Sequence, residues 1–136
     1  MQDTSESYDP GTDRGLVNIF ETGSRIERLV SGFRFVEGPV WCPGQNALLF
    51  SDIIGDTMYR WSEQDGLSIF RKPSNMANGN TRDREGRLLS CEHATSRVSR
   101  TDADGNYEVL ATHFEGRELN SPNDIIVSRN GNIFFT

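Results

Sequence analysis

The chain has 136 residues, of which 35% are hydrophobic and 25% are charged, and its formal net charge is −6. This composition is typical of a globular protein, and the scattered Lys and Arg of an acidic chain exclude a general nucleic-acid binder, which needs clustered basic side chains. No run approaches the roughly 20 apolar residues of a membrane-spanning helix, and the polar N-terminus shows no apolar signal segment. We therefore expect a cytoplasmic protein without a membrane partner.

In chain order, residues 1–15 are polar and are expected to form a loose leader. From about residue 16 the chain alternates short apolar runs, rich in aromatic and β-branched residues, with turn signals made of Gly, Asp, Asn and Pro. Gly or Pro interrupts every window long enough for an amphipathic helix. The predicted fold class is therefore all-β.

Three segments share one layout, in which a polar start leads into a short strand, a glycine turn and an apolar strand. Leu48, Leu88 and Ile133 take equivalent places in them, 40 and 45 residues apart. A period of this length with about four short strands is typical of a β-propeller blade. Residues 16–136 are therefore predicted to form a partial β-propeller of about two and a half blades, truncated in the third blade.

The first blade is expected over residues 37–73, the second over 78–113, and the third from residue 123. The predicted strands of the first blade cover residues 38–42, 47–53, 57–62 and 67–71, the outer strands of the second cover 97–100 and 107–110, and a further outer-type strand covers 26–30. Cys42 and Cys91 lack the spacing of a zinc site or a disulfide framework, so both are expected to be small buried side chains in strands.

Glu37, Asn78 and Asn123 each stand 10 or 11 residues before the reference position of their segment. They are thus expected to begin the innermost strands of three successive blades, which line the central channel of a propeller. Carboxylate and amide oxygens suit a hard cation such as Ca²⁺, which takes about 6–8 oxygen ligands. Asn also adopts left-handed turn conformations readily, so a turn role for Asn78 and Asn123 is the alternative.

Five stretches then occur in a specific order: FRFVEGPVW, FSDIIGDTMYRW, SNMANGNTRD, GRLLSCEH and LNSPNDIIV. Together they resemble the SMP-30/gluconolactonase/luciferin-regenerating-enzyme (LRE-like) family, over residues 27–136. The resemblance implies a six-bladed propeller with a divalent ion, usually calcium, in its central channel. It also implies hydrolysis of sugar lactones or related esters, so a small-molecule lactone or ester is the expected partner.

The resemblance also implies roles for particular residues. Glu37 of EGPVW matches the carboxylate metal ligand of the family, and Asn123 of SPND matches an asparagine ligand. Asn78 or Asn80 of the NGN segment matches positions that contact substrate or water, and His93 is a candidate substrate contact for which a structural role is the alternative. The remaining ligands and the catalytic base of the family are expected beyond Thr136, so no catalytic residue is predicted here.

The predicted function is a metal-dependent hydrolysis of sugar lactones, in which the cation polarises the carbonyl and a carboxylate activates water. Residues 1–136 would supply part of the central metal site and are expected to be inactive alone. The alternatives are a non-catalytic propeller that binds calcium or another ligand, and an inactive truncated fragment.

Overall fold

A computed structural model of the chain describes residues 6–7, 19 and 24–136, which divide into two units, Met1–Gly32 and Phe33–Thr136. In the first unit, β1 (Glu6–Ser7) pairs antiparallel with β2 (Arg25–Ile26). The predicted leader, residues 1–15, lies outside the described residues except for this short strand. Of the strand predicted over residues 26–30, only Ile26 is in a strand.

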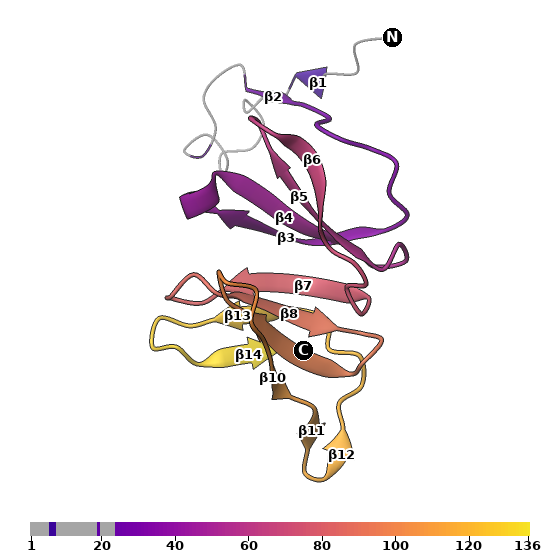
Figure 1. Ribbon diagram of the computed structural model, residues 1–136, viewed down its shortest axis with the longest axis vertical. Coiled ribbons are helices and arrows are strands. Elements are labelled where there is room, and N and C mark those ends of the chain that lie inside the picture. Colours follow the sequence, from indigo (N-terminus) through magenta and orange to yellow (C-terminus); the bar gives the residue numbers. More distant parts are fainter. Residues whose placement is uncertain (1–5, 8–18, 20–23) are drawn as a thin grey trace. The chain divides into compact units, whose positions relative to one another are not determined.

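The first blade is a four-stranded antiparallel sheet in the second unit (Figure 1). Its strands pair in sequence order and are β3 (Val36–Cys42), β4 (Ala47–Asp52), β5 (Thr57–Ser62) and β6 (Gly66–Arg71). A single 3₁₀ turn, Pro43–Gln45, joins β3 to β4, and no helix in the described part of the chain is long and apolar enough to cross a membrane. The bounds agree with the predicted strands to within two residues.

The second blade repeats this arrangement with β7 (Ala77–Arg82), β8 (Leu88–Glu92), β9 (Arg97–Thr101) and β10 (Tyr107–Ala111). A third sheet contains β13 (Ile125–Val127) and β14 (Ile133–Phe135). Between them the chain forms a small hairpin of β11 (His113–Phe114) and β12 (Arg117–Glu118), which the sequence analysis did not predict. The innermost strands β3, β7 and β13 are neighbours in this order. The all-β partial propeller is therefore confirmed.

Three hairpin turns share one backbone geometry. In residues 83–87, 102–106 and 128–132 the first backbone N–H donates to the fifth carbonyl, at 3.0, 3.1 and 2.8 Å. The fourth residue of each turn is a glycine with positive φ, namely Gly86, Gly105 and Gly131, and its N–H donates to the first carbonyl. Only glycine adopts this conformation without steric cost. Turns 83–87 and 128–132 each join the first two strands of a sheet, so they give the second blade and the third sheet the same register, whereas turn 102–106 joins β9 to β10.

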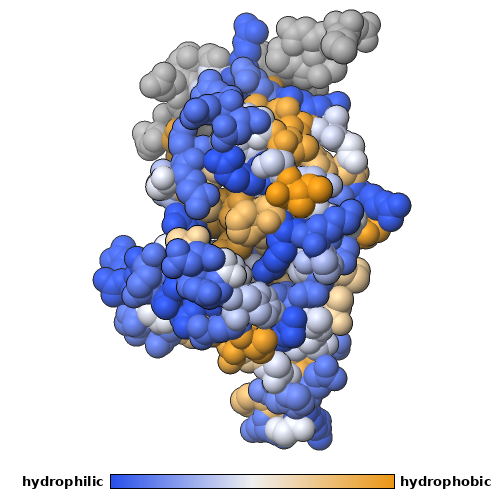
Figure 2. Space-filling model, in the orientation of Figure 1, coloured by the Kyte–Doolittle hydropathy of each residue, from blue (hydrophilic) through white to orange (hydrophobic). Residues whose placement is uncertain are grey.

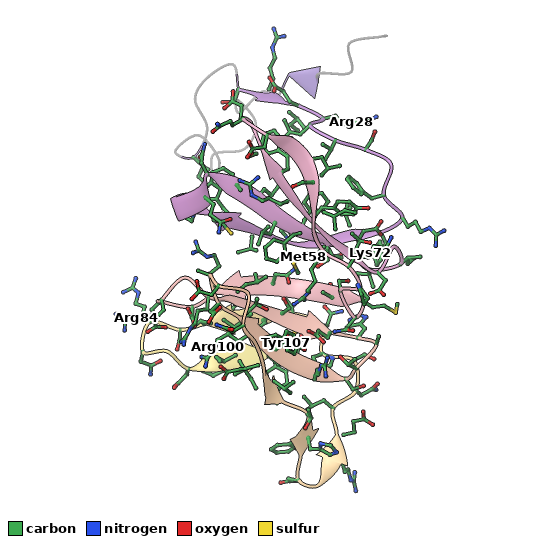
Figure 3. The ribbon with its side chains drawn as sticks, viewed as in Figure 1. Arg28, Met58, Lys72, Arg84, Arg100 and Tyr107 are labelled. Atoms are coloured by element: carbon green, nitrogen blue, oxygen red, sulfur yellow. The ribbon has the colours of Figure 1, made fainter. Side chains whose placement is uncertain are left out.

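The core lies between the sheets. One cluster, formed by Cys42, Leu49, Met58, Ala77 and Leu88, fills the space between the first two blades, where Met58 is labelled in Figure 3. The other, formed by Leu89, Cys91, Val98 and Ile125, lies between the second blade and the third sheet. Both faces of β8 are covered, because successive side chains of a strand point to opposite faces, and all its residues are buried.

Both cysteines are free and buried, as predicted. Burial raises the pKa of the Cys91 thiol to about 12, so it stays protonated at neutral pH and behaves as a small apolar side chain. Apolar side chains also remain at the surface, where Figure 2 shows them among polar residues. They include Leu67 and Ile69 of β6, and Ile126 and Phe134 of the third sheet.

Candidate functional site

A β-bulge lies near the start of each of the inner strands β3 and β7. In β3 the pairing passes from Glu37–Ser51 to Val40–Leu49, and in β7 from Ala77–Glu92 to Asn80–Ser90. Two residues therefore face one partner residue in each bulge. This register makes Gly38, and not Glu37, the equivalent of Asn78.

The third sheet begins in the same way. The N–H of Asn123 donates to the Thr136 carbonyl at 2.6 Å, and the Thr136 N–H donates to the Asp124 carbonyl at 3.0 Å. Asn123 and Asp124 thus face one residue, and Asn123 is the equivalent of Asn78. The predicted equivalence holds for the two asparagines, whereas Glu37 comes one residue earlier in its blade.

The loop after β3 explains the shift. Cys42 pairs with Ala47 across a loop of four residues, whereas Arg82 pairs with Leu88 across the five-residue turn 83–87. The sequence spacing predicts that Leu48 is equivalent to Leu88. In the structure Leu48 is instead equivalent to Leu89. The spacing could not show this, because both leucines are apolar.

The three strand starts lie in direct contact. Gly38 packs so closely on the second blade that a Cβ atom would lie 2.0 Å from the Asn78 carbonyl oxygen. On the other side of β7, the N–H of Gly79 donates to the Asn123 carbonyl at 2.8 Å. Glu37 adjoins Gly38 in the chain, so the structure gathers Glu37, Asn78 and Asn123 at the beginnings of adjacent inner strands.

The side chains at these positions differ in their surroundings. Asn78 is buried, and its Nδ2 lies 3.0 Å from Nε2 of the half-buried His93. The structure thus pairs two residues that were predicted independently as substrate contacts. Glu37 and Asn123 are exposed, and neither side chain forms a hydrogen bond within the described part of the chain. Their oxygens are available to a ligand.

The surroundings of Asn80 differ from those of Asn78. Its Nδ2 lies within 2.9 Å of the carbonyl oxygens of Gly38 and Asn78 and within 2.8 Å of Ser51 Oγ. Its Oδ1 accepts from Ser90 Oγ at 2.7 Å. The Asn80 amide forms hydrogen bonds with groups of both blades, so the structure favours a role in joining the blades over substrate binding.

The exposed oxygens suit only part of a hard-cation site. No cluster of three or more His, Cys, Asp or Glu side chains in residues 6–7, 19 and 24–136 could hold a metal. Glu37 offers a carboxylate and Asn123 an uncharged amide oxygen, which are ligand types that Ca²⁺ accepts. These two side chains fit such an ion but leave most of its 6–8 positions to other groups.

The turn before β7 is held in an unusual conformation. Asn75 and Met76 have positive φ angles of 61° and 52°, which cost free energy in residues other than glycine. Asp56 Oδ1 of the first blade accepts the N–H of Ser74 at 3.1 Å and that of Met76 at 2.7 Å. Asn75 Nδ2 donates to Glu92 Oε2 at 3.0 Å. Two carboxylates therefore hold the turn that leads to Asn78.

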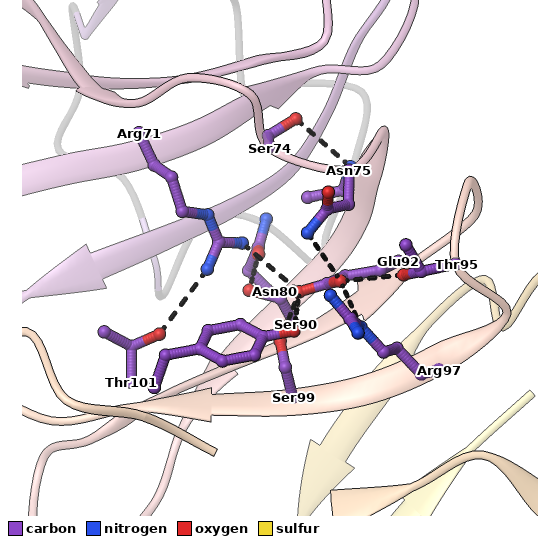
Figure 4. Close-up of polar contacts among 12 residues, drawn as sticks. Arg71, Ser74, Asn75, Asn80, Ser90, Glu92, Thr95, Arg97, Ser99 and Thr101 are labelled. Atoms are coloured by element: carbon purple, nitrogen blue, oxygen red, sulfur yellow. Dashed lines mark hydrogen bonds and ion pairs between the residues drawn. The ribbon is translucent and has the colours of Figure 1, made fainter. Parts of the chain in front are cut away.

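Glu92 is the centre of a buried polar network that the sequence analysis missed (Figure 4). Its side chain is fully buried, and it accepts hydrogen bonds at 2.6 to 3.0 Å from Asn75, Thr95, Arg97, Ser99 and Tyr107. Arg71 of the first blade lies 3.8 Å away. An acidic residue directly after the largely apolar residues 88–91 was the available signal, since buried carboxylates need such partners.

Burial alone raises the pKa of the Glu92 carboxyl, because it disfavours the charged form. The hydrogen bonds from Ser99, Arg97, Thr95 and Tyr107 stabilise the carboxylate and outweigh this effect. The pKa of Glu92 is therefore lowered below its ordinary value. Glu92 is a structural anion directly before His93 in the chain.

Comparison with known proteins shows the family of this chain. Residues 35–136 match the SMP-30/Gluconolactonase/LRE-like region. The chain belongs to this family. It is 31% identical over 132 residues to a gluconolactonase of Zymomonas mobilis subsp. mobilis, an alignment that covers 87% of this chain and 37% of that protein. The chain therefore spans little more than a third of the length of this curated relative.

Solved structures of other proteins show the same fold. A gluconolactonase structure from Xanthomonas campestris is 37% identical, has a TM-score of 0.80, and is matched over 84% of this chain and 38% of its own. A virginiamycin B lyase structure from Staphylococcus aureus is also similar, with 17% identity and a TM-score of 0.61 over 83% of this chain and 38% of that one. This second likeness concerns the fold alone, which does not determine function.

Proposed function

We propose that this chain is part of a metal-dependent hydrolase of sugar lactones, and that Glu37 and Asn123 provide two oxygen ligands of its divalent cation, with Ca²⁺ the best fit. The observation that supports the site is the contact of Gly38 with Asn78 and of Gly79 with Asn123, which makes the starts of three inner strands adjacent. The relatives named as gluconolactonases support the substrate class.

The side chains of the proposed site have different roles, which follow from their chemistry. Glu37 contributes negative charge and Asn123 a neutral oxygen, and a bound cation would act as the Lewis acid that polarises the lactone carbonyl. Asn78 Nδ2 donates to His93 Nε2 when the imidazole carries its proton on Nδ1. Asn78 Oδ1 is then free to accept a hydrogen bond from a sugar hydroxyl. We assign no catalytic base to the described residues.

Calcium affinity tests this proposal directly. We expect Glu37→Gln to raise the Kd for Ca²⁺ by about tenfold or more, measured by calorimetry on a protein of the relative's full length that contains this sequence, because the variant loses the anionic ligand but keeps the shape of the side chain. Glu118→Gln in β12 is the matched control, since it makes the same chemical change on an exposed hairpin. Equal affinities of the wild type and both variants would exclude Glu37 as a ligand.

Measuring the turnover of a lactone distinguishes a hydrolase from a calcium-binding propeller that has no catalytic activity. We expect the 136-residue chain to show little hydrolysis of gluconolactone, because it spans 37% of its curated relative and has no assigned base. In a protein of the relative's full length, hydrolysis should require calcium and fall with the substitution at Glu37. Calcium binding without turnover in the longer protein would favour the non-catalytic alternative.

A further inference from the structure

A pocket lies at the ends of the inner strands opposite to the candidate site. It has a volume of about 350 Å³ and lies between the turns that join β7 to β8 and β13 to β14. Its lining residues are Arg82, Asp83, Arg84, Val127, Ser128 and Arg129. The two turns lie at the left of Figure 1, and Figure 3 labels Arg84 at this edge.

The pocket is positively charged in an acidic chain. Three arginines against one aspartate give a formal charge of +2, whereas the whole chain has −6. The charge of Asp83 is already balanced, because Arg87 Nε donates to its Oδ2 at 2.6 Å. The attraction for an anion therefore comes from three guanidinium groups.

Hydrogen bonds hold the guanidinium groups of Arg82 and Arg84, and no ion pair among the described residues neutralises any of the three arginines. Arg82 Nε and Nη2 donate to the Gly86 carbonyl at 3.0 and 2.8 Å, and Arg84 Nη1 donates to the Arg129 carbonyl at 2.8 Å. Each guanidinium has five N–H donors, so at least three remain on each of Arg82 and Arg84. The ion pairs among the described residues involve other arginines, namely Arg60, Arg71, Arg87, Arg97 and Arg100.

Comparison of the three shared turns shows that the positive charge of the pocket is not a general feature of these turns. Arg84 and Arg129 both take the second place of the shared turn, in adjacent blades. In the third such turn, residues 102–106, this place is Ala103. Arg82 aligns with Cys42 and Val127 at the ends of the other inner strands. Position 82 thus holds an arginine where the equivalent positions hold the apolar Cys42 and Val127. This arginine completes the set of three in the pocket.

We propose that this pocket binds the phosphate group of a small metabolite. Guanidinium groups match the oxygens of a phosphate with parallel N–H donors, and several together suit a doubly charged anion. The volume is at the small end of ligand sites, which fits a sugar phosphate better than a macromolecule. Four residue steps of β7 separate Asn78 from Arg82, about 13 Å along an extended strand, so the pocket is distinct from the Glu37 site.

Titration of the 136-residue chain with inorganic phosphate, followed by calorimetry or amide chemical shifts, tests the proposal. We expect saturable binding, centred on residues 82–84 and 127–129, that weakens at least fivefold in Arg84→Ala and in Arg129→Ala. Arg117→Ala in β12 removes the same charge elsewhere and should leave the affinity unchanged. Glucose 6-phosphate should bind at least as tightly as phosphate, and glucose should not bind.

Arg84 and Arg129 are exposed, so their variants should keep the melting temperature of the wild type when phosphate is absent. Ala103→Arg adds an arginine to the third turn without the other two, and it should create no second phosphate site. Absence of saturable binding, an equal loss in Arg117→Ala, or binding of succinate as tight as that of phosphate would each overturn the proposal. These outcomes do not depend on calcium or lactone hydrolysis, so they leave the proposed function untouched.

Discussion

Replacing Glu92 by Gln is expected to lower the free energy of unfolding of the chain by about 3 kcal/mol or more. The substitution keeps the size of the side chain but removes the charge that faces Arg97 and Arg71. It also turns NH₂ donors toward groups that are themselves donors, including Tyr107 and Ser99. Urea unfolding followed by tryptophan fluorescence measures the loss, with Trp41 and Trp61 as probes.

Glu108→Gln is the matched control for this experiment. Glu108 pairs with Arg100 at 2.8 Å but its side chain is 56% exposed, so the expected loss is below about 1 kcal/mol. Equal losses in the two variants would show that the buried network adds nothing beyond a surface ion pair. A larger loss in Glu92→Gln would show that the buried network, which Arg71 of the first blade approaches at 3.8 Å, contributes more to stability than a surface ion pair.

The same carboxylate predicts a pH dependence. The pKa of Glu92 is lower in the folded chain than its ordinary value of 4.5, so folding stabilises the charged form. This stabilisation is complete above pH 4.5 and is lost as the pH falls through the lower folded pKa. The wild type should therefore lose more stability than Glu92→Gln on acidification below pH 4.5, and parallel pH profiles would contradict this.

Replacing Gly38 by Ala is expected to cost at least about 3 kcal/mol, or to prevent folding. Two effects add up. Gly38 has a φ of +54°, where an L-residue is strained, and the new Cβ would lie 2.0 Å from the Asn78 carbonyl oxygen and 2.6 Å from Asn80 Nδ2. The backbones of two blades would have to separate where the candidate site begins, so calcium affinity should fall as well.

Gly105→Ala separates strain from crowding. Gly105 has a φ of +84° but nothing within 4 Å of the position of a Cβ, so only the backbone strain of about 1–2 kcal/mol is expected. Thermal or urea unfolding of both variants gives the difference. If Gly105→Ala is as harmful as Gly38→Ala, the close contact between β3 and β7 contributes nothing measurable.

The sequence alone predicted some features of the candidate site and not others. Glu37 and Asn123 were found because they lie in short motifs with a characteristic order, and the structure leaves both side chains exposed. Asn80 was not distinguishable from Asn78 by sequence, since both lie in one NGN segment. Their roles separate only when Gly38 and Ser51 of the first blade approach Asn80. Such contacts between blades leave no local pattern in the chain.

The sequence by itself determined the blade architecture, because strands and glycine turns are set by neighbours within a few residues. The turns 83–87, 102–106 and 128–132 illustrate this, as each is closed by its own Asp or Ser and its own Gly. Only the tertiary structure decided the one-residue register of Glu37, the buried charge of Glu92 and the arginine pocket between the second blade and the third sheet. The physical reason is that bulge pairing, desolvation and charge convergence depend on residues distant in the chain, which meet only after the blades pack.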